Sequence, residues 1–258
     1  MEFFSSSYWQ AGENASALIL QQCLCGDTPI LFACVCGGQT ESEGRACGYF
    51  SRRLLEWFRS MRFSRAVGNP DAFLKKQEVK LKRLLQQVDN EVEQAGLALG
   101  EVAFDKMESL PKRNAVSLPG RNAGGKPVSL SGILCIGQEF LLFGRGNTGI
   151  TLLNRCMGKP HVENMPKRDI LSLQLGVMEP DVGVLLATKP FTDSIPREAL
   201  QEGLFVEEVV TERQTEKHLR ELGRAGEENG GKNMAAVLFY IRPDKAFLPI
   251  PYCSNFIG

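Results

Sequence analysis

Amphipathic helical patterns occur in both the first and the last third of this 258-residue chain, and apolar strand-like runs lie before, between and after them. Helices and long antiparallel strands distributed in this way are typical of a layered sandwich, in which helices cover a pair of packed sheets. The apolar fraction of 43% is sufficient to build a substantial buried core. We therefore expect an α+β fold with two antiparallel sheets flanked by helices.

Local patterns predict the elements of this sandwich. The apolar runs 17–25 and 30–36 flank Gly26–Pro29, which predicts a hairpin. Helices are expected over 42–62, after Asn69-Pro70, over 196–202 and over 211–225, the first with apolar residues at helical spacing (Ala46, Phe50, Leu54, Trp57 and Met61). Strands are expected over 128–136, 139–144, 149–155, 182–188 and 234–241. The first three of these, joined by tight turns, predict an antiparallel meander.

Length and composition favour one domain over residues 1–258, with a mobile polar loop at about 111–127. Within that loop, GRNAGGKP resembles a phosphate-binding loop. Pro127, however, occupies the position of the magnesium-binding hydroxyl, and a strand follows instead of a helix. We interpret this segment as a loop without a nucleotide.

Charge excludes some classes of partner. The chain carries 30 basic and 30 acidic residues, so no overall field attracts nucleic acid or an anionic membrane. The basic run of the second helix (Lys75, Lys76, Lys80, Lys82 and Arg83) is interpreted as a solvated face, because it lacks aromatic stacking partners. No apolar stretch is long enough to span a bilayer, and the N-terminal residues lack the features of a signal peptide, so we expect a cytoplasmic protein.

Four cysteines form a CxC…CxC pattern in the predicted hairpin. If Cys25 faces Ile30, then Cys23 faces Phe32 and Cys34 faces Gln21. Cys25 and Cys34 then lie roughly 13 Å apart along the strands, too far for one tetrahedral zinc ion. Buried, reduced thiols are the expected outcome.

Five short motifs resemble those of the PPM family of metal-dependent serine/threonine phosphatases, the type 2C enzymes. In chain order they are Glu13-Asn14-Ala15-Ser16, Cys34-Val35-Cys36-Gly37-Gly38, Gly146-Asn147-Thr148-Gly149, Lys189-Pro190-Phe191-Thr192-Asp193 and Lys232-Asn233. In this family they correspond to N-E-D, D-G-M-G-G, G-D-S-R, D-G-L-T-D and D-N. The resemblance spans nearly the whole chain and implies a four-layer αββα sandwich.

The metal-binding aspartates of the family are absent at the matching positions, which here are Ala15, Cys34, Lys189 and Lys232. In the family, aspartates and a glycine carbonyl hold two divalent ions that activate a water for attack on a phosphoester. An ammonium has no lone pair, and it repels a divalent ion by about 8 kcal/mol at 4 Å with an effective dielectric of 20. A nucleophilic role for Cys34 lacks a base, because neither His161 nor His218 is placed beside it in the sequence.

The resemblance therefore implies a catalytically inactive domain, a pseudophosphatase that binds, regulates or scaffolds a protein partner such as a phosphoprotein or a kinase. We expect no catalytic residues, no cofactor and no metal. The expected binding residues of the former active-site pocket are Ala15, Cys34, Val35, Asn147, Lys189, Asp193, Lys232 and Asn233. Lys189 and Lys232 either bind an anion such as a phosphoryl group or are merely solvated at strand ends. The alternative is an active phosphatase that holds Mn²⁺ or Mg²⁺ with other carboxylates, such as Glu13, Asp181 or Asp193.

Overall fold

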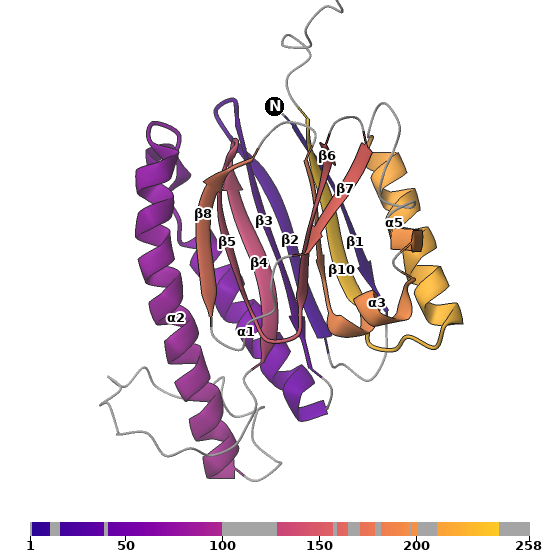
Figure 1. Ribbon diagram of the computed structural model, residues 1–258. Helices are drawn as coiled ribbons and strands as arrows, with labels where there is room; N and C mark the ends of the chain where they lie inside the picture. The colour runs from indigo at the N-terminus through magenta and orange to yellow at the C-terminus, as the bar shows by residue number, and fades with distance from the viewer. Residues whose placement is uncertain are drawn as a thin grey trace, which may run out of the picture.

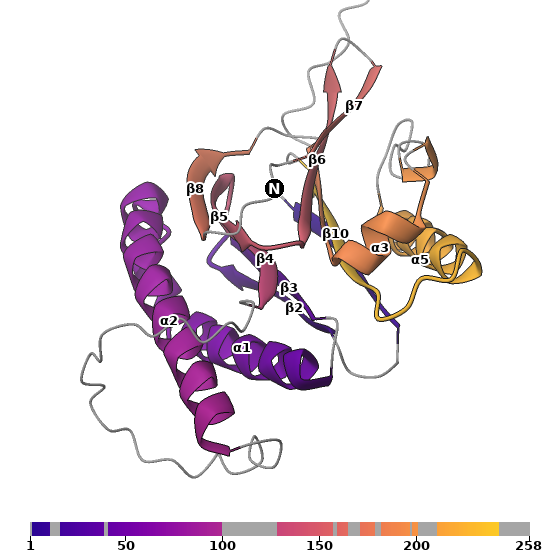
Figure 2. The same ribbon diagram turned by 60° about the horizontal axis from the view of Figure 1, so that its bottom comes forward.

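Two five-stranded antiparallel sheets pack face to face, and helices cover the outer face of each (Figure 1). The computed structural model describes residues 2–10, 16–38, 41–99, 128–156, 159–164, 171–178, 182–196, 198–200 and 211–242. The layer order is helices, sheet, sheet, helices, as Figure 2 shows from a second direction. The expected α+β sandwich is thus confirmed.

The first sheet has the strand order β2-β3-β4-β5-β8. Its strands are β2 (Ser16–Cys25), β3 (Thr28–Gly37), β4 (Ser129–Ile136), β5 (Glu139–Arg145) and β8 (Ser172–Val177). Helices α1 (Glu41–Arg59) and α2 (Pro70–Leu99) cover it, joined through a short 3₁₀ turn, η1 (Phe63–Arg65). The apolar stripe predicted for α1 packs on this sheet, where Phe50 and Leu54 are fully buried beside Phe32.

The second sheet has the order β1-β10-β9-β6-β7. Its strands are β1 (Glu2–Trp9), β10 (Ala235–Arg242), β9 (Gly183–Ala187), β6 (Gly149–Cys156) and β7 (Lys159–Asn164). Helices α3 (Lys189–Ser194) and α5 (Glu212–Glu228) cover it. Thr211 begins α5 with a capping box, because its side chain accepts from the Gln214 N–H while Gln214 Oε1 accepts from the Thr211 N–H.

Both faces of β3 are buried, and this explains its uninterrupted apolar sequence. Ile30, Phe32 and Cys34 belong to the core beneath α1 and α2. Leu31, Ala33 and Val35 belong to the core between the two sheets. A third core lies under α3 and α5, where Phe191 and Leu219 are fully buried.

The register of the first hairpin differs from the expected one by two residues. Cys25 pairs with Thr28, Cys23 with Ile30 and Cys34 with Ile19. The turn consists of Gly26 and Asp27 alone, because Gly26 adopts a φ of 59° and Thr28 already belongs to β3. Cys25 and Cys34 are therefore six residues apart along the ladder, about 20 Å, which separates the two thiol pairs still further.

The predicted meander is wrong in its third strand. β4 pairs with β5 as expected, but β5 then pairs with β8, and β6 lies in the other sheet between β9 and β7. The turn at Gly146-Asn147 carries the chain from one sheet to the other, and Ile150 then joins the core between the sheets. Sheet membership depends on the distant pairing of β6 with β9, which local spacing does not encode.

Two expectations fall wholly or partly on residues that the structure does not describe. The loop at 111–127, with its GRNAGGKP segment, lies outside the described residues. So do residues 197, 201 and 202 of the helix expected over 196–202, whose residues 198–200 are helical. The basic residues of α2 are exposed. No helix in the described ranges is both long and apolar enough to cross a membrane.

Candidate functional site

Four of the sequence motifs converge at one end of the sandwich, the lower end in Figure 1, where α3 lies. A Cβ atom built on Gly37 would lie 3.1 Å from the Thr188 Cγ2 methyl and 3.7 Å from that of Thr148. The Thr188 N–H donates to the Ala235 carbonyl at 2.9 Å, and the Ala235 N–H donates to Thr188 Oγ1 at 3.0 Å. The ends of β3 and β9, the turn before β6 and the start of β10 therefore form one surface, which we call the strand-end site.

Threonine methyl groups fill the centre of this site. Gly37 has no side chain, and the Thr188 methyl packs against its backbone. Thr148 and Thr188 are both buried. The two methyl groups thus occupy the space that a side chain at position 37 would need.

Lys189 and Asp193 form an ion pair with each other on α3. The strand expected over 182–188 is β9, which ends at Ala187, and a helix that was not expected begins at Lys189, with Pro190 in its first turn. The spacing of four residues then places the two side chains together. Both are about half exposed, so the ammonium is neutralised by the carboxylate at the rim of the site.

Lys232 and Asn233 lie in the connection between α5 and β10. Lys232 is exposed and has no ion-pair partner among the residues the structure describes. Asn233 has a φ of 57°, a left-handed conformation that asparagine tolerates better than most residues. This backbone turn leads directly into Met234 and Ala235, which start the buried strand β10.

Cys34 and Val35 are fully buried and face opposite sides of β3. Cys34 lies under α1, with its Sγ atom 4.0 Å from that of Cys36. The hydrogen bond shared with Cys36 and the burial of both thiols hold the pKa of Cys34 well above its usual range. The Cys34 thiol is therefore neutral and out of reach of solvent, as expected for a buried, reduced thiol, and it does not face a ligand as the expected binding residue of the former active-site pocket would.

Of the remaining predicted positions, the structure describes Asn147 but not the others. Asn147 is exposed at the strand-end site, and its N–H donates to Ser129 Oγ at 3.0 Å. Ala15 lies outside the described residues, as do the alternative carboxylates Glu13 and Asp181.

The donor set present at the strand-end site does not fit a pair of manganese or magnesium ions. Lysine ammonium groups have no lone pair, and the Asp193 carboxylate is already engaged by Lys189. In the described part of the chain, no three histidine, cysteine or carboxylate side chains are close enough to hold a metal ion. We therefore derive no metal-dependent step from this arrangement.

The sequence patterns did not point to Arg145, which holds the turn before β6 against α1 and α2. Its guanidinium forms a bidentate ion pair with Asp89 of α2, with one N···O distance of 2.7 Å, and its Nε donates to the Val128 carbonyl at 3.0 Å. The guanidinium also lies 5.2 Å from the centre of the Phe50 ring. Because Arg145 directly precedes the Gly146-Asn147 turn, it ties that turn to α1 and α2. The only sequence signal was an arginine at the end of an otherwise apolar strand.

The sequence matches no protein-family model and no curated protein. Solved structures do match over 93% of this chain. One is PppA, described as a key regulatory component of T6SS in Pseudomonas aeruginosa, with 14% identity, 98% of its own chain covered and a TM-score of 0.57. Others are the S. agalactiae serine/threonine phosphatase (10% identity, 100% covered, TM-score 0.61) and the catalytic domain of the phosphatase PstP in complex with two manganese ions (12%, 99%, 0.56). These similarities concern the fold.

Proposed function

Because the chain has the fold of the PPM-type serine/threonine phosphatases, we propose that it is a pseudophosphatase, a regulatory or scaffold domain without metal-dependent hydrolysis. The observation that carries this proposal is the composition of the strand-end site. Lys189 and Lys232 stand where the resemblance places metal-binding aspartates, and the Thr188 methyl packs on Gly37.

The charges at the strand-end site oppose the binding of divalent ions. Four carboxylates at these positions would attract two divalent ions, whereas two ammonium groups repel each ion by about 8 kcal/mol apiece at 4 Å and an effective dielectric of 20. Among the described residues of the site, the Asp193 carboxylate is already paired with the Lys189 ammonium. Two-metal activation of water lacks its ligands here.

The proposed ligand is a protein partner with an acidic or phosphorylated segment. Lys232 is exposed beside the convergence of β3, β9 and β10, and lysine binds phosphate and carboxylate groups as a point charge. A regulatory role for this fold has a parallel in PppA, which is described as a regulatory component. The former active-site surface would then recognise what related enzymes hydrolyse.

Metal content and turnover test the absence of catalysis. We expect the purified protein, incubated with excess Mn²⁺ and desalted, to retain less than about 0.1 equivalents of metal and to leave an aryl phosphate unhydrolysed. The catalytic domain of PstP, treated identically, is the positive control because it binds two manganese ions. Two retained equivalents together with turnover would establish instead an active phosphatase with a rearranged site.

The binding of a phosphorylated partner is tested separately, with phosphopeptides. Phosphopeptide arrays should reveal peptides that bind the protein, and Lys232→Ala should weaken that binding about tenfold. Lys217→Ala, a lysine of α5 with 71% side-chain exposure, is the matched control and should leave binding unchanged. Equal binding by both variants would remove the strand-end site from the proposal.

A further inference from the structure

Three cations lie on one face of α2, on a surface distinct from the strand-end site. Lys76, Lys80 and Arg83 are separated by four and three residues, a spacing that places them in one row along a helix. All three are exposed, and within the described residues none forms an ion pair. We call this row the cationic ladder; it lies in the upper half of α2 in Figure 1, whereas the strand-end site is at the lower end.

Repulsion within the cationic ladder destabilises the helix α2. No acidic residue occurs three or four positions from Lys76, Lys80 or Arg83, so each neighbours another cation instead. Like charges at this spacing weaken a helix. A solvated face does not require this, because Lys217 pairs with Glu221 on α5 at 3.8 Å and Lys75 pairs with Asp71 on α2 itself at 2.7 Å.

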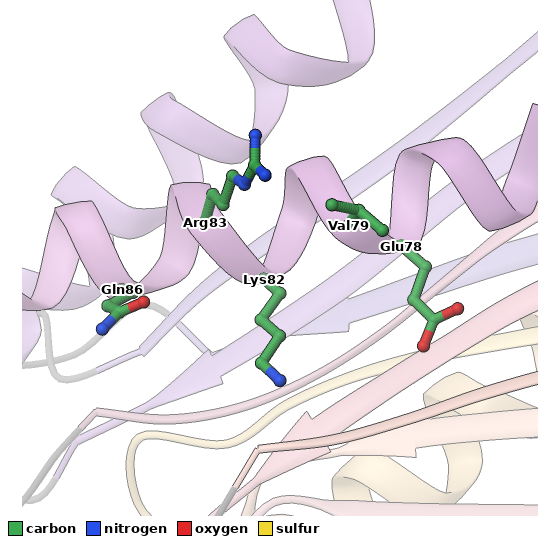
Figure 3. A pocket seen from close by; sticks show the side chains of 5 residues that line it. All are labelled: Glu78, Val79, Lys82, Arg83 and Gln86. Atoms are coloured by element: carbon green, nitrogen blue, oxygen red, sulfur yellow. The ribbon is translucent and has the colours of Figure 1, made fainter.

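An apolar contact point accompanies the ladder. Val79 lies between its members and is 51% exposed. A shallow depression beside it is lined by Glu78, Val79, Lys82, Arg83 and Gln86 (Figure 3). In Figure 3, Lys82 and Glu78 project to one side of the helix and Arg83 to the other, which leaves Val79 accessible between them.

We propose that the cationic ladder binds an acidic α-helix of a protein partner. Carboxylates spaced four and three residues apart on that helix match the row of cations, which spans about 10 Å, and an apolar side chain covers Val79. Nucleic acid fits less well, because positions 74–99 of α2 contain no aromatic residue for base stacking and the whole chain carries no net charge. This inference does not depend on the proposed function, since the ladder is far from the strand-end site.

A designed peptide tests the ladder directly. The probe is a helical 14-residue peptide with Glu at the matching positions and Leu opposite Val79, compared with a scrambled peptide of equal composition. By fluorescence anisotropy, we expect the patterned peptide to bind at least about tenfold tighter than the scrambled one, and Val79→Ser to weaken it severalfold. Heparin is a third probe; preference for heparin, with no discrimination between the peptides, would overturn the proposal in favour of a general polyanion site.

Matched charge reversals locate the binding surface. The triple variant Lys76→Glu, Lys80→Glu, Arg83→Glu should lose the patterned peptide at least about tenfold. The control variant Arg213→Glu, Lys217→Glu, Arg224→Glu changes the net charge equally on the exposed face of α5 and should bind as the unaltered protein does. If both variants lose binding equally, the interaction is nonspecific and the proposal fails.

The melting temperature provides an independent test of the electrostatic repulsion within the cationic ladder. Lys80→Glu replaces two repulsive pairs by two attractive ones, so we expect the melting temperature of the free protein to rise by about 2 °C. Lys80→Gln removes only the repulsion and should give about half that shift. A fall in melting temperature with both variants would show that the cations stabilise α2, which contradicts the argument for a binding role.

Discussion

Arg145 is the one charged side chain that is buried among the described residues, with 7% exposure. Its guanidinium satisfies its donors by binding both Asp89 oxygens and the Val128 carbonyl, and it packs on the Phe50 ring. Burying an arginine is costly unless its charge and its donors have partners, and here the partners come from α2 and from Val128, which directly precedes β4. One side chain thus fixes the turn that carries the chain between the two sheets.

Replacing Arg145 should be costly for this reason. We expect Arg145→Ala to lower the free energy of unfolding by about 3 kcal/mol, because it leaves Asp89 unpaired and removes the packing on Phe50. Lys189→Ala breaks an exposed ion pair and should cost no more than about 0.5 kcal/mol. Urea denaturation measures both, and a similar loss for the two variants would contradict the role assigned to Arg145.

The candidate site could be predicted from the sequence only in part. The resemblance identified the motifs that contain Gly37, Asn147, Lys189 and Asn233, and the structure brings these segments to one end of the sandwich. The sequence does not show which face of the sheet Cys34 lies on. Both faces of β3 are apolar, so no alternation of polar and apolar residues distinguishes the two faces. The Lys189–Asp193 pair was missed because it exists only if α3 begins at Lys189, a boundary set by the fold around it.

The bounds of helices and strands were easier to predict than the pairing of the strands. The bounds expected for α1, α5, β4 and β9 agree with the structure to within a few residues, since each has a clear apolar period and end signals. The assignment of β6 to the second sheet was not predictable, because its pairing with β9 joins residues 30 to 38 positions apart. The hairpin register was missed because Thr28 and Pro29 resemble turn residues but form the start of β3.

The packing of α5 on β1 depends on a glycine. A Cβ on Gly223 would lie 2.2 Å from the Tyr8 ring, whose hydroxyl donates to Glu227 at 2.6 Å. We expect Gly223→Ala to destabilise the protein by about 2 kcal/mol through displacement of the helix. Gly48→Ala is the matched control in α1: nothing lies within 4 Å of its Cβ, so it should stabilise the protein by about 0.5–1 kcal/mol. Two shifts of the same sign in chemical denaturation would refute this account of the α5 interface.

The four layers separate two surfaces with different properties. The strand-end site is built from the ends of strands in both sheets and is closed by threonine methyl groups. The cationic ladder lies on the outer helix layer and is open to solvent. A domain with this arrangement can contact one partner through its outer helices while the strand-end site stays free, which is what the proposed scaffold role requires.

We propose that this protein combines a PPM-type fold with a strand-end site that does not hold metal ions. A crystal of the protein soaked with manganese and phosphate, with diffraction recorded at the manganese absorption edge, tests it most directly. The account predicts no anomalous peak between Gly37, Lys189 and Lys232, with the Thr188 methyl still packed on Gly37. Two strong peaks at that position, coordinated by protein oxygens, would contradict it.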